Sequence, residues 1–416
     1  MEPVDTTDAS PQPEPRAEIA LPTTVRARLQ HLDHGVLVDT RALERVRERF
    51  DTEQAHTLGR FLANAQSPAT LRAYRADWTS FGAWCLAEQR TSLPADPVDV
   101  AVYLAACAEQ RGQDGTTWAY SPATLERRSA AIAAVHGAHG LDSPTRAEVV
   151  RMTLRGIRRT RRARPRRKAP VVLDTLEAML AVRPPEGHPG GVARRRDAVL
   201  LLTGFAGALR RSELAGLTFD DLQTRTDPAT GAPTLVASLW ATKTDQEGRA
   251  HQRVALPRGR HRATCPVCAV VDWSQLLVVH RDGGGEAVRE WLQRPRAPQP
   301  AARAHSCQGL TRLELADGTQ RPLLPSVDRH GRPADRAMTP KAVGNLVKRY
   351  AQRAGLDPDD FGGHSLRAGF ATQAALGGAT DREIMRQGRW TNAQTVHDYI
   401  RTANPLEDNA VTRLGL

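Results

Sequence analysis

The sequence has no apolar run long enough to span a membrane. Its longest apolar stretch, Ala198 to Leu209, contains about twelve residues, whereas a spanning helix needs about twenty. The first twenty residues are acidic and proline-bearing and lack the apolar centre of a secretory signal. We therefore expect a cytoplasmic protein with no membrane partner, in which Ala198 to Leu209 form a buried helix.

Cysteine is scarce and odd in number, with five residues in 416. In a chain of this size, that count is typical of a reducing compartment rather than of a disulfide framework. Cys265 and Cys268 form a C-x-x-C pair, a spacing that zinc sites use. His261, His305 and Cys307 could complete such a site, but no second C-x-x-C pair supports it. We expect two small buried side chains at the start of a helix, and no bound metal.

Lysine is rarer still, since 54 of the 58 basic side chains are arginines. The formal net charge is +12, a surplus that suits a polyanionic partner such as nucleic acid. The arginine excess is typical of a GC-rich genome, so each lysine that persists against it calls for a reason. The four are Lys168, Lys243, Lys341 and Lys348.

Composition divides the first part of the chain into a tail and a helical region. Residues 1–22 are rich in Pro, Glu, Asp and Thr and should form a disordered tail. Residues 23–154 carry amphipathic helical patterns. Ser67, Ser121 and Ser143 each precede a proline, which provides an N-cap hydroxyl and a proline at the first helical position. We predict a bundle of short helices here.

Residues 155–170 form a basic segment between two folded regions. Nine of the fourteen residues from 155 to 168 are basic, and Pro165 and Pro170 prevent one continuous helix. Such a run often forms only a solvated linker. It could also lie along a duplex and neutralise phosphates, which would make binding fall steeply with salt. The candidate phosphate contacts are Arg158, Arg159, Arg161, Arg162, Arg164, Arg166, Arg167 and Lys168.

The second folded region, residues 171–403, mixes helical and strand patterns. Helices are expected at 173–182 and 192–204. Two strands joined by a turn are expected over 234–257. Residues 281–335 are rich in Gly, Pro, Arg and Asp, and this composition predicts an irregular insertion.

One further helix should begin at Thr339-Pro340 and end at Gly355. Its apolar residues share one face, and its other face carries Lys341 and Lys348. These lysines are candidate contacts to a nucleic-acid groove or backbone, although solvation alone explains many such faces. Residues 404–416 follow as a carboxy-terminal tail.

Four separated motifs carry side chains suited to one phosphate-handling site. In chain order they are A-L-R-R-S-E-L, T-K-T, G-H-S-L-R and W-T-N, with a tyrosine nine residues beyond the tryptophan of the last. The sequence has no G-x-x-x-x-G-K-[ST] loop and no evident carboxylate cluster, so neither ATP nor two-metal chemistry is indicated. The side chains concerned are Arg210, Glu213, Lys243, His364, Arg367, Trp390 and Tyr399.

Together these motifs resemble the signature of the tyrosine recombinase (phage integrase) family, and their spacing is most similar to that of Cre-like recombinases. The resemblance covers residues 57–416 and is weak only in the insertion. It implies a mainly α fold with a small antiparallel sheet. In that fold a helical, SAM-like core-binding domain (23–154) is joined by the basic linker (155–170) to a mixed α/β catalytic domain (171–403).

The resemblance also implies a function, namely site-specific recombination of double-stranded DNA through a 3′-phosphotyrosyl intermediate. The expected assembly is a homotetramer on DNA, in which the tail of residues 404–416 docks into a neighbouring protomer. Neither a cofactor nor a metal is expected. Two alternatives stay open: a type IB topoisomerase, which shares the chemistry, and a DNA-binding protein that has lost catalysis.

The family's roles carry over to the matching residues. Arg210 and Arg367 would hold the scissile phosphate, and Tyr399 would be the nucleophile. His364 would donate to the phosphate or help to deprotonate the nucleophile. Trp390 stands where many relatives have a second histidine, and its indole can donate a hydrogen bond but cannot titrate.

Two further roles concern Lys243 and Glu213. Lys243 would protonate the leaving 5′-oxygen, a task for which arginine, with a pKa above about 12, is poorly suited. Glu213 would orient nearby basic groups.

Overall fold

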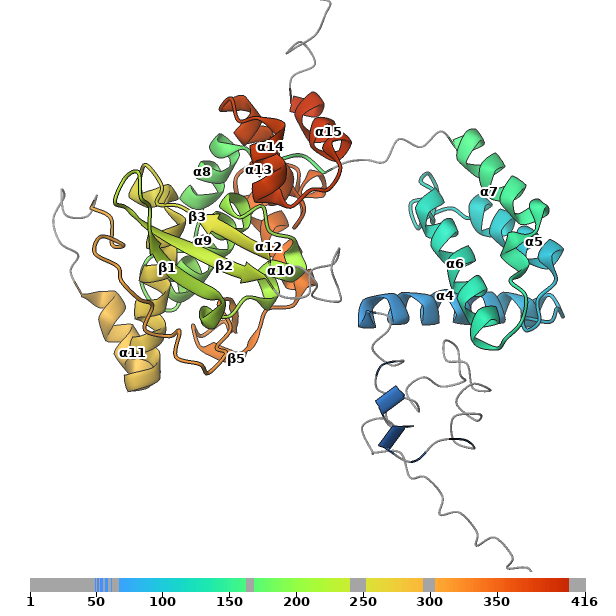
Figure 1. Cartoon of the computed structure of the whole chain (residues 1–416), viewed down its shortest axis with the longest axis horizontal. Helices are drawn as coiled ribbons and strands as arrows, with labels where there is room; N and C mark the ends of the chain where they lie inside the picture. Colours follow the sequence, from blue (N-terminus) through green and yellow to red (C-terminus); the bar gives the residue numbers. More distant parts are fainter. Residues whose placement is uncertain are drawn as a thin grey trace, which may run out of the picture. The chain divides into compact units, whose positions relative to one another are not determined.

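The computed structural model describes residues 67–161, 168–239, 252–294 and 304–403, together with a few isolated positions between 49 and 61. For residues 401–403 it describes the backbone alone. The chain divides into two compact units (Figure 1). We refer to Met1–Pro165 as the amino-terminal unit and to Arg166–Leu416 as the carboxy-terminal unit.

The described part of the amino-terminal unit is helical. Its elements are α4 (Pro68–Ala87), α5 (Pro97–Glu109), α6 (Pro122–Ala138), η1 (Pro144–Arg146) and α7 (Glu148–Arg161). Ser67 and Ser121 cap α4 and α6 as predicted, each accepting a hydrogen bond from a backbone N–H three residues on. The prediction for Ser143 was wrong in part: it precedes only a short 3₁₀ turn and makes no side-chain cap.

The core of this unit is aromatic and aliphatic. Phe81 and Tyr103 are fully buried, with ring centroids 5.0 Å apart. Leu125, Ile132 and Val150 from the other helices complete the cluster. The aromatic stripe of α4 is therefore core, as its helical spacing predicts.

Helix α7 continues to Arg161, four residues beyond the predicted end at Ile157. Leu154 and Ile157 pack against the core of the unit, which holds this part of the helix in place. The Arg161 guanidinium lies 4.3 Å from the centre of the Trp118 ring and donates to the Tyr120 carbonyl. The first part of the basic segment is thus a helix packed on its own unit.

The carboxy-terminal unit is mainly α with two small antiparallel sheets, in agreement with the predicted fold class. Its helices are α8 (Leu173–Ala181), α9 (Gly190–Ala206), α10 (Arg211–Gly216), α11 (Pro266–Gln293), α12 (Pro340–Arg353), α13 (Ser365–Leu376), α14 (Asp381–Gly388) and α15 (Ala393–Ala403). Short 3₁₀ turns occur at η2 (Phe219–Asp221), η3 (Arg262–Thr264) and η5 (Pro358–Asp360).

The first sheet has the strand order β1-β2-β3, and the second pairs β4 with β5. Their bounds are β1 (Leu222–Thr226), β2 (Pro233–Leu239), β3 (Gln252–Leu256), β4 (Pro325–Val327) and β5 (Pro333–Ala337). Strands β2 and β3 pair from Leu235↔Leu256 to Leu239↔Gln252, so the predicted strand pair is confirmed. The residues that join them, 240–251, lie outside the described residues.

Helix α9 contains most of the longest apolar stretch of the sequence and is buried along most of its length, as predicted. Helix α11 packs along it. The irregular insertion predicted at 281–335 was wrong in two places. Helix α11 continues to Gln293 across a kink at Gly284, because Val288, Trp291 and Leu292 share an apolar face on the core. Strands β4 and β5 form a second hairpin in the same range.

A close backbone contact joins the start of this unit to α13. The Val171 N–H donates to the Ser365 carbonyl at 2.9 Å. A Cβ atom on Gly369 would lie 1.9 Å from the Val171 carbonyl oxygen, so only glycine fits there. None of the helices that the structure describes is both long and apolar enough to cross a bilayer.

Candidate active site

The site begins where α9 ends. Ala208 has a left-handed backbone with φ of 46°, a conformation that costs energy for any residue other than glycine. Gly207 precedes it, and a Cβ atom there would lie 2.8 Å from the Thr203 carbonyl oxygen. The chain therefore turns sharply and then presents Arg210 at the N-cap of α10.

Arg210 is fixed by a glutamate one turn into α10. The Arg210 backbone N–H donates to Glu213 Oε2 at 2.8 Å, and its Nη1 donates to Oε1 at 2.5 Å. The Glu213 side chain is only 5% exposed. A buried carboxylate that receives the backbone and the guanidinium together leaves Arg210 little freedom to move.

Arg367 is buried in the first turn of α13, with 2% of its surface exposed. Its Nη1 donates to the carbonyl of the strained Ala208 at 2.6 Å. The turn at Ala208 thus links the start of α13 to the segment that carries Arg210.

Arg389 is a third arginine of the site, and it was not predicted from the sequence. It ends α14 with a left-handed backbone, φ 58°. Its Nη2 donates to Glu213 Oε2 at 2.6 Å, and its Nη1 donates to the Gly207 carbonyl at 3.3 Å. The only available signal was its position next to Trp390, and in a chain with 54 arginines that signal has little contrast.

The three guanidinium groups lie around one carboxylate, which leaves excess positive charge in a largely buried place. Burial alone would raise the pKa of Glu213, but Arg389 and Arg210 lower it overall. Burial lowers the pKa of Arg367 to about 9, and the charges of Arg210 and Arg389 lower it further. Burial also lowers the pKa of Arg389. A bound anion would relieve this excess, so the arrangement is suited to a phosphate.

Trp390 connects the arginines to the tyrosine. The Arg367 Cζ lies 4.1 Å from the centre of the Trp390 ring, which is cation–π geometry. The ring stacks on Phe370, and its centroid is 5.9 Å from that of Tyr399. It also covers Gly388 so closely that a Cβ atom there would lie 1.7 Å from a ring carbon.

Tyr399 lies on α15 beside His364. His364 Nε2 is hydrogen-bonded to the Tyr399 hydroxyl, and the ring centroids are 5.8 Å apart. Val396, one turn earlier on α15, is buried with Ala371 of α13 and Ile384 of α14. This small core holds the helix that carries the tyrosine against the helix that carries Arg367. Figure 1 shows α13, α14 and α15 grouped together.

The structure brings six of the seven predicted site residues into one connected network. They are Arg210, Glu213, His364, Arg367, Trp390 and Tyr399. The seventh, Lys243, lies outside the described residues, as does the tail of residues 404–416.

The predicted DNA contacts are dispersed. Arg158 and Arg159 are exposed on α7, and Arg158 pairs with Glu126 at 2.8 Å. Lys341 is exposed at the start of α12. Lys348 pairs with the Asp359 carboxylate at 3.0 Å, and Lys168 donates to the backbone carbonyl of the same residue. Four of the predicted contacts lie outside the described residues: Arg162, Arg164, Arg166 and Arg167.

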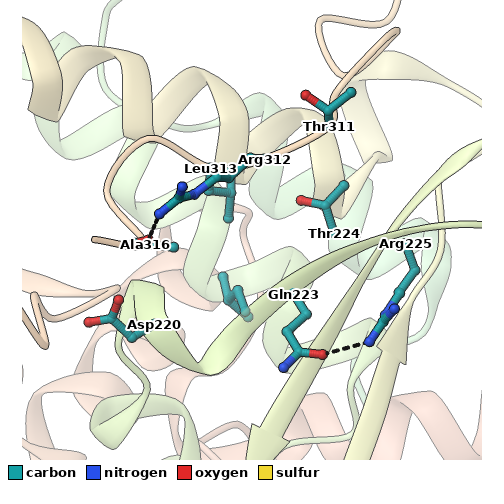
Figure 2. Close-up of a pocket in the computed structure, with 9 residues that line it drawn as sticks. Asp220, Gln223, Thr224, Arg225, Thr311, Arg312, Leu313 and Ala316 are labelled. Atoms are coloured by element: carbon teal, nitrogen blue, oxygen red, sulfur yellow. Dashed lines mark hydrogen bonds between the residues drawn. The ribbon is translucent and has the colours of Figure 1, made fainter. Parts of the chain in front are cut away.

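A separate pocket in the carboxy-terminal unit lies along strand β1 (Figure 2). It is lined by Gln223, Thr224 and Arg225 of that strand and by residues 311–313 and 316. Gln223 and Arg225 are hydrogen-bonded to each other at 3.1 Å, so they are partly occupied. None of its lining residues belongs to the arginine network, so the network does not depend on it.

Comparison with known proteins agrees with this geometry. Residues 308–404 match the model of the phage integrase family. The chain is 31% identical over 359 residues to the integrase/recombinase xerD homolog of Selenomonas ruminantium, which covers 85% of this chain and 88% of that protein. The chain belongs to the phage integrase (tyrosine recombinase) family. The family model includes the stretch with His364, Arg367, Trp390 and Tyr399, whereas Arg210 lies upstream of it.

Two solved structures illustrate the similarity to other members of the phage integrase family. The XerH site-specific recombinase, in a post-cleavage complex with palindromic difH substrate, is 14% identical with a TM-score of 0.47. The match covers 90% of this chain and 89% of that one. A lambda integrase dimer bound to a COC′ core site is 12% identical with a TM-score of 0.43, over 83% of this chain and 92% of that one.

Proposed function

We propose that the chain is a site-specific recombinase that cuts and rejoins double-stranded DNA through a covalent bond to Tyr399. The observation that carries the proposal is the network in which three arginines lie around Glu213 and contact, through Trp390, the hydrogen-bonded pair of His364 and Tyr399. Family membership supports the same reaction class.

In this proposal Arg210 and Arg367 bind the non-bridging oxygens of the scissile phosphate. Strand transfer passes through a pentacoordinate phosphorus with additional negative charge, and fixed guanidinium forks stabilise such charge without reorganising. Arg389 is a positioning residue, because its guanidinium is directed to Glu213 and to the Gly207 carbonyl. It holds the carboxylate that in turn holds Arg210.

The Tyr399 oxygen attacks the phosphorus, and the bond from phosphorus to the 5′-oxygen breaks. The products are a 3′-phosphotyrosyl bond and a free 5′-hydroxyl, so the energy of the phosphodiester is retained and no ATP is needed. The proton of Tyr399 passes to His364 or to solvent, which the hydrogen bond between the two side chains favours. Lys243 supplies the proton that the leaving 5′-oxygen takes up.

DNA recognition is assigned to both units and to the basic segment between them. The exposed arginines of α7 and Lys341 of α12 would contact phosphates. Residues 23–154 would act as a core-binding domain and residues 171–403 as the catalytic domain. Four protomers would assemble on DNA and exchange strands in pairs.

The tail of residues 404–416 would dock into a neighbouring protomer and couple cleavage to assembly. Deleting residues 405–416 should then weaken tetramer formation on DNA while leaving binding of a monomer to a half-site intact. Sedimentation of the protein–DNA complexes measures both. An unchanged tetramer with unchanged activity would contradict the docking proposal and leave the chemistry unaffected.

The covalent step can be tested before the target sequence has been identified. A pool of random-sequence duplexes, each with a nick that prevents religation, should yield DNA that stays attached to the protein in SDS. Tyr399→Phe should yield no attached DNA but should still bind the enriched sequences, because only the hydroxyl is removed. Tyr74→Phe, in the amino-terminal unit, is the matched control and should behave as wild type.

Trp390 offers a second test, through the glycine beneath its ring. Gly388→Ala should displace the ring from Arg367 and Tyr399 and slow single-turnover cleavage by about a hundredfold, as small misplacements in active sites do. Gly377→Ala, at the end of α13, meets its neighbours only at 3.4 Å or more and is the control. Wild-type rates in Gly388→Ala would show that the position of Trp390 is unimportant for cleavage.

A further inference from the structure

We propose that Cys265, Cys268, His305 and Cys307 form a structural zinc site. Their ligand atoms all lie within 4.8 Å of one another. His305 Nδ1 is 3.3 Å from Cys268 Sγ and 4.0 Å from Cys307 Sγ, and the two sulfurs are 3.5 Å apart. A tetrahedral zinc ion with Zn–S of about 2.3 Å and Zn–N of about 2.0 Å separates its ligands by roughly 3.5–3.8 Å, so the observed spacings bracket those of a zinc centre.

The first two ligands lie where the backbone already favours a thiolate. Cys265 is the N-cap of α11, and Cys268 is in the first turn of that helix. Cys265 Sγ accepts backbone N–H groups from Gly259 at 3.2 Å and from Cys268 at 3.4 Å. Such donors stabilise metal-bound sulfur and orient it. A Cβ atom on Gly259 would lie 2.8 Å from the Cys265 Cα, so the loop can approach this closely only as glycine.

The other two ligands come from a distant segment, which the metal would bind to the start of α11. Cys307 is fully buried, and His305 is half-buried. The expectation of two small buried cysteines at a helix start is confirmed for Cys265 and Cys268, but the convergence of a third thiol and an imidazole on them was not predicted. His261, the other histidine considered, is exposed and does not belong to the cluster.

The donor set favours zinc over other metals. Three sulfurs and one nitrogen form a soft, four-coordinate set, whereas calcium and magnesium require oxygen ligands. All four positions are filled by protein, which is typical of a structural rather than a catalytic zinc site. Only a disulfide between Cys268 and Cys307 would compete, and their sulfurs are 3.5 Å apart against about 2.05 Å in a bond.

The site would stabilise the carboxy-terminal unit at a point remote from the arginine network in sequence. Helix α11 packs along α9, which leads into Ala208 and Arg210. The segment that begins with His305 and Cys307 continues to Leu313 and Leu315 of the core and lines the pocket of Figure 2. Zinc would thus join two edges of the same core. The inference is independent of the proposed recombinase activity.

Metal content of the untagged full-length chain, purified under reducing conditions with zinc supplied, tests the proposal. We expect about one zinc per chain by mass spectrometry of the metal. Replacement by cobalt(II) should give thiolate-to-metal charge-transfer absorption and tetrahedral d–d bands. Cys307→Ser and His305→Ala should lose most of the metal. His305→Cys should keep it, because four cysteines also make a structural zinc site. Cys85→Ser, which removes a buried cysteine in the other unit, is the control.

A second measurement covers the case in which the variants do not fold. Wild-type protein stripped with a chelator should melt at a lower temperature, and added zinc should restore the original melting temperature, because binding to the folded state alone stabilises it. The proposal is overturned if wild type binds neither zinc nor cobalt, or if zinc leaves the melting temperature of the stripped chain unchanged. A Cys268–Cys307 disulfide in protein isolated from cells would overturn it equally.

Discussion

Arg367→Ala is expected to slow single-turnover DNA cleavage by about 10²–10³-fold, the effect typical of removing one fixed donor to transition-state charge. The guanidinium is buried, its pKa is lowered to about 9 by burial and by two neighbouring arginines, and it is bonded to the Ala208 carbonyl. Negative charge on a reacting phosphate would stabilise the charged form of Arg367. The interaction therefore strengthens as that charge develops.

Arg367→Lys separates charge from geometry. Lysine keeps the positive charge, but it cannot donate to the Ala208 carbonyl and to a phosphate through one planar fork. We expect a rate between those of wild type and Arg367→Ala. Arg353→Ala, an exposed arginine at the end of α12, is the control. Rates within a fewfold of wild type for Arg367→Ala, in a variant that binds DNA and is folded, would exclude Arg367 from phosphate binding.

Glu213→Gln is expected to have the largest effect on stability, about 3–5 kcal/mol in the free energy of unfolding. The substitution removes the one carboxylate that the guanidinium groups of Arg210 and Arg389 both contact. Two largely buried cations would then face each other with only amide and carbonyl dipoles as partners. Denaturant unfolding of the full chain measures the loss.

Glu383→Gln provides a matched control, because Glu383 occupies the same third position in a capping box, at α14, but is exposed. Its loss should be much smaller. The pH dependence gives the sign. The pKa of Glu213 is lowered in the folded state, so its contribution is present at neutral pH and is lost as the pH falls through the acidic range. The gap in stability between wild type and Glu213→Gln should therefore narrow in acid, and a constant gap would contradict the assigned ion pairs.

The sequence alone was sufficient for the fold class and for the central site residues. Arg210, Glu213, His364 and Arg367 could be found because each belongs to a short motif whose spacing matches one turn of a helix. Trp390 and Tyr399 follow at fixed distance within α14, α15 and their connection. Local spacing of this kind is visible in a single sequence, because it does not depend on tertiary contacts.

Features that depend on tertiary contacts could not be predicted in the same way. Arg389 is one arginine among 54, and only the folded chain brings it to Glu213. The ligand atoms of Cys268 and His305 are separated by 37 residues and meet only after the core has formed. Glycines at 283–285 suggested irregular chain, yet the apolar residues beyond them continue α11.

The most direct test of the central claim is to identify the residue that carries the DNA. Wild-type protein trapped on the nicked duplexes is digested with protease and nuclease, and the nucleotide-bearing peptide is sequenced by mass spectrometry. The account predicts one modified peptide, with the nucleotide linked through its 3′-phosphate to the Tyr399 oxygen and a free 5′-hydroxyl on the released strand. Attachment at any other residue, or through a 5′-phosphate, would contradict it.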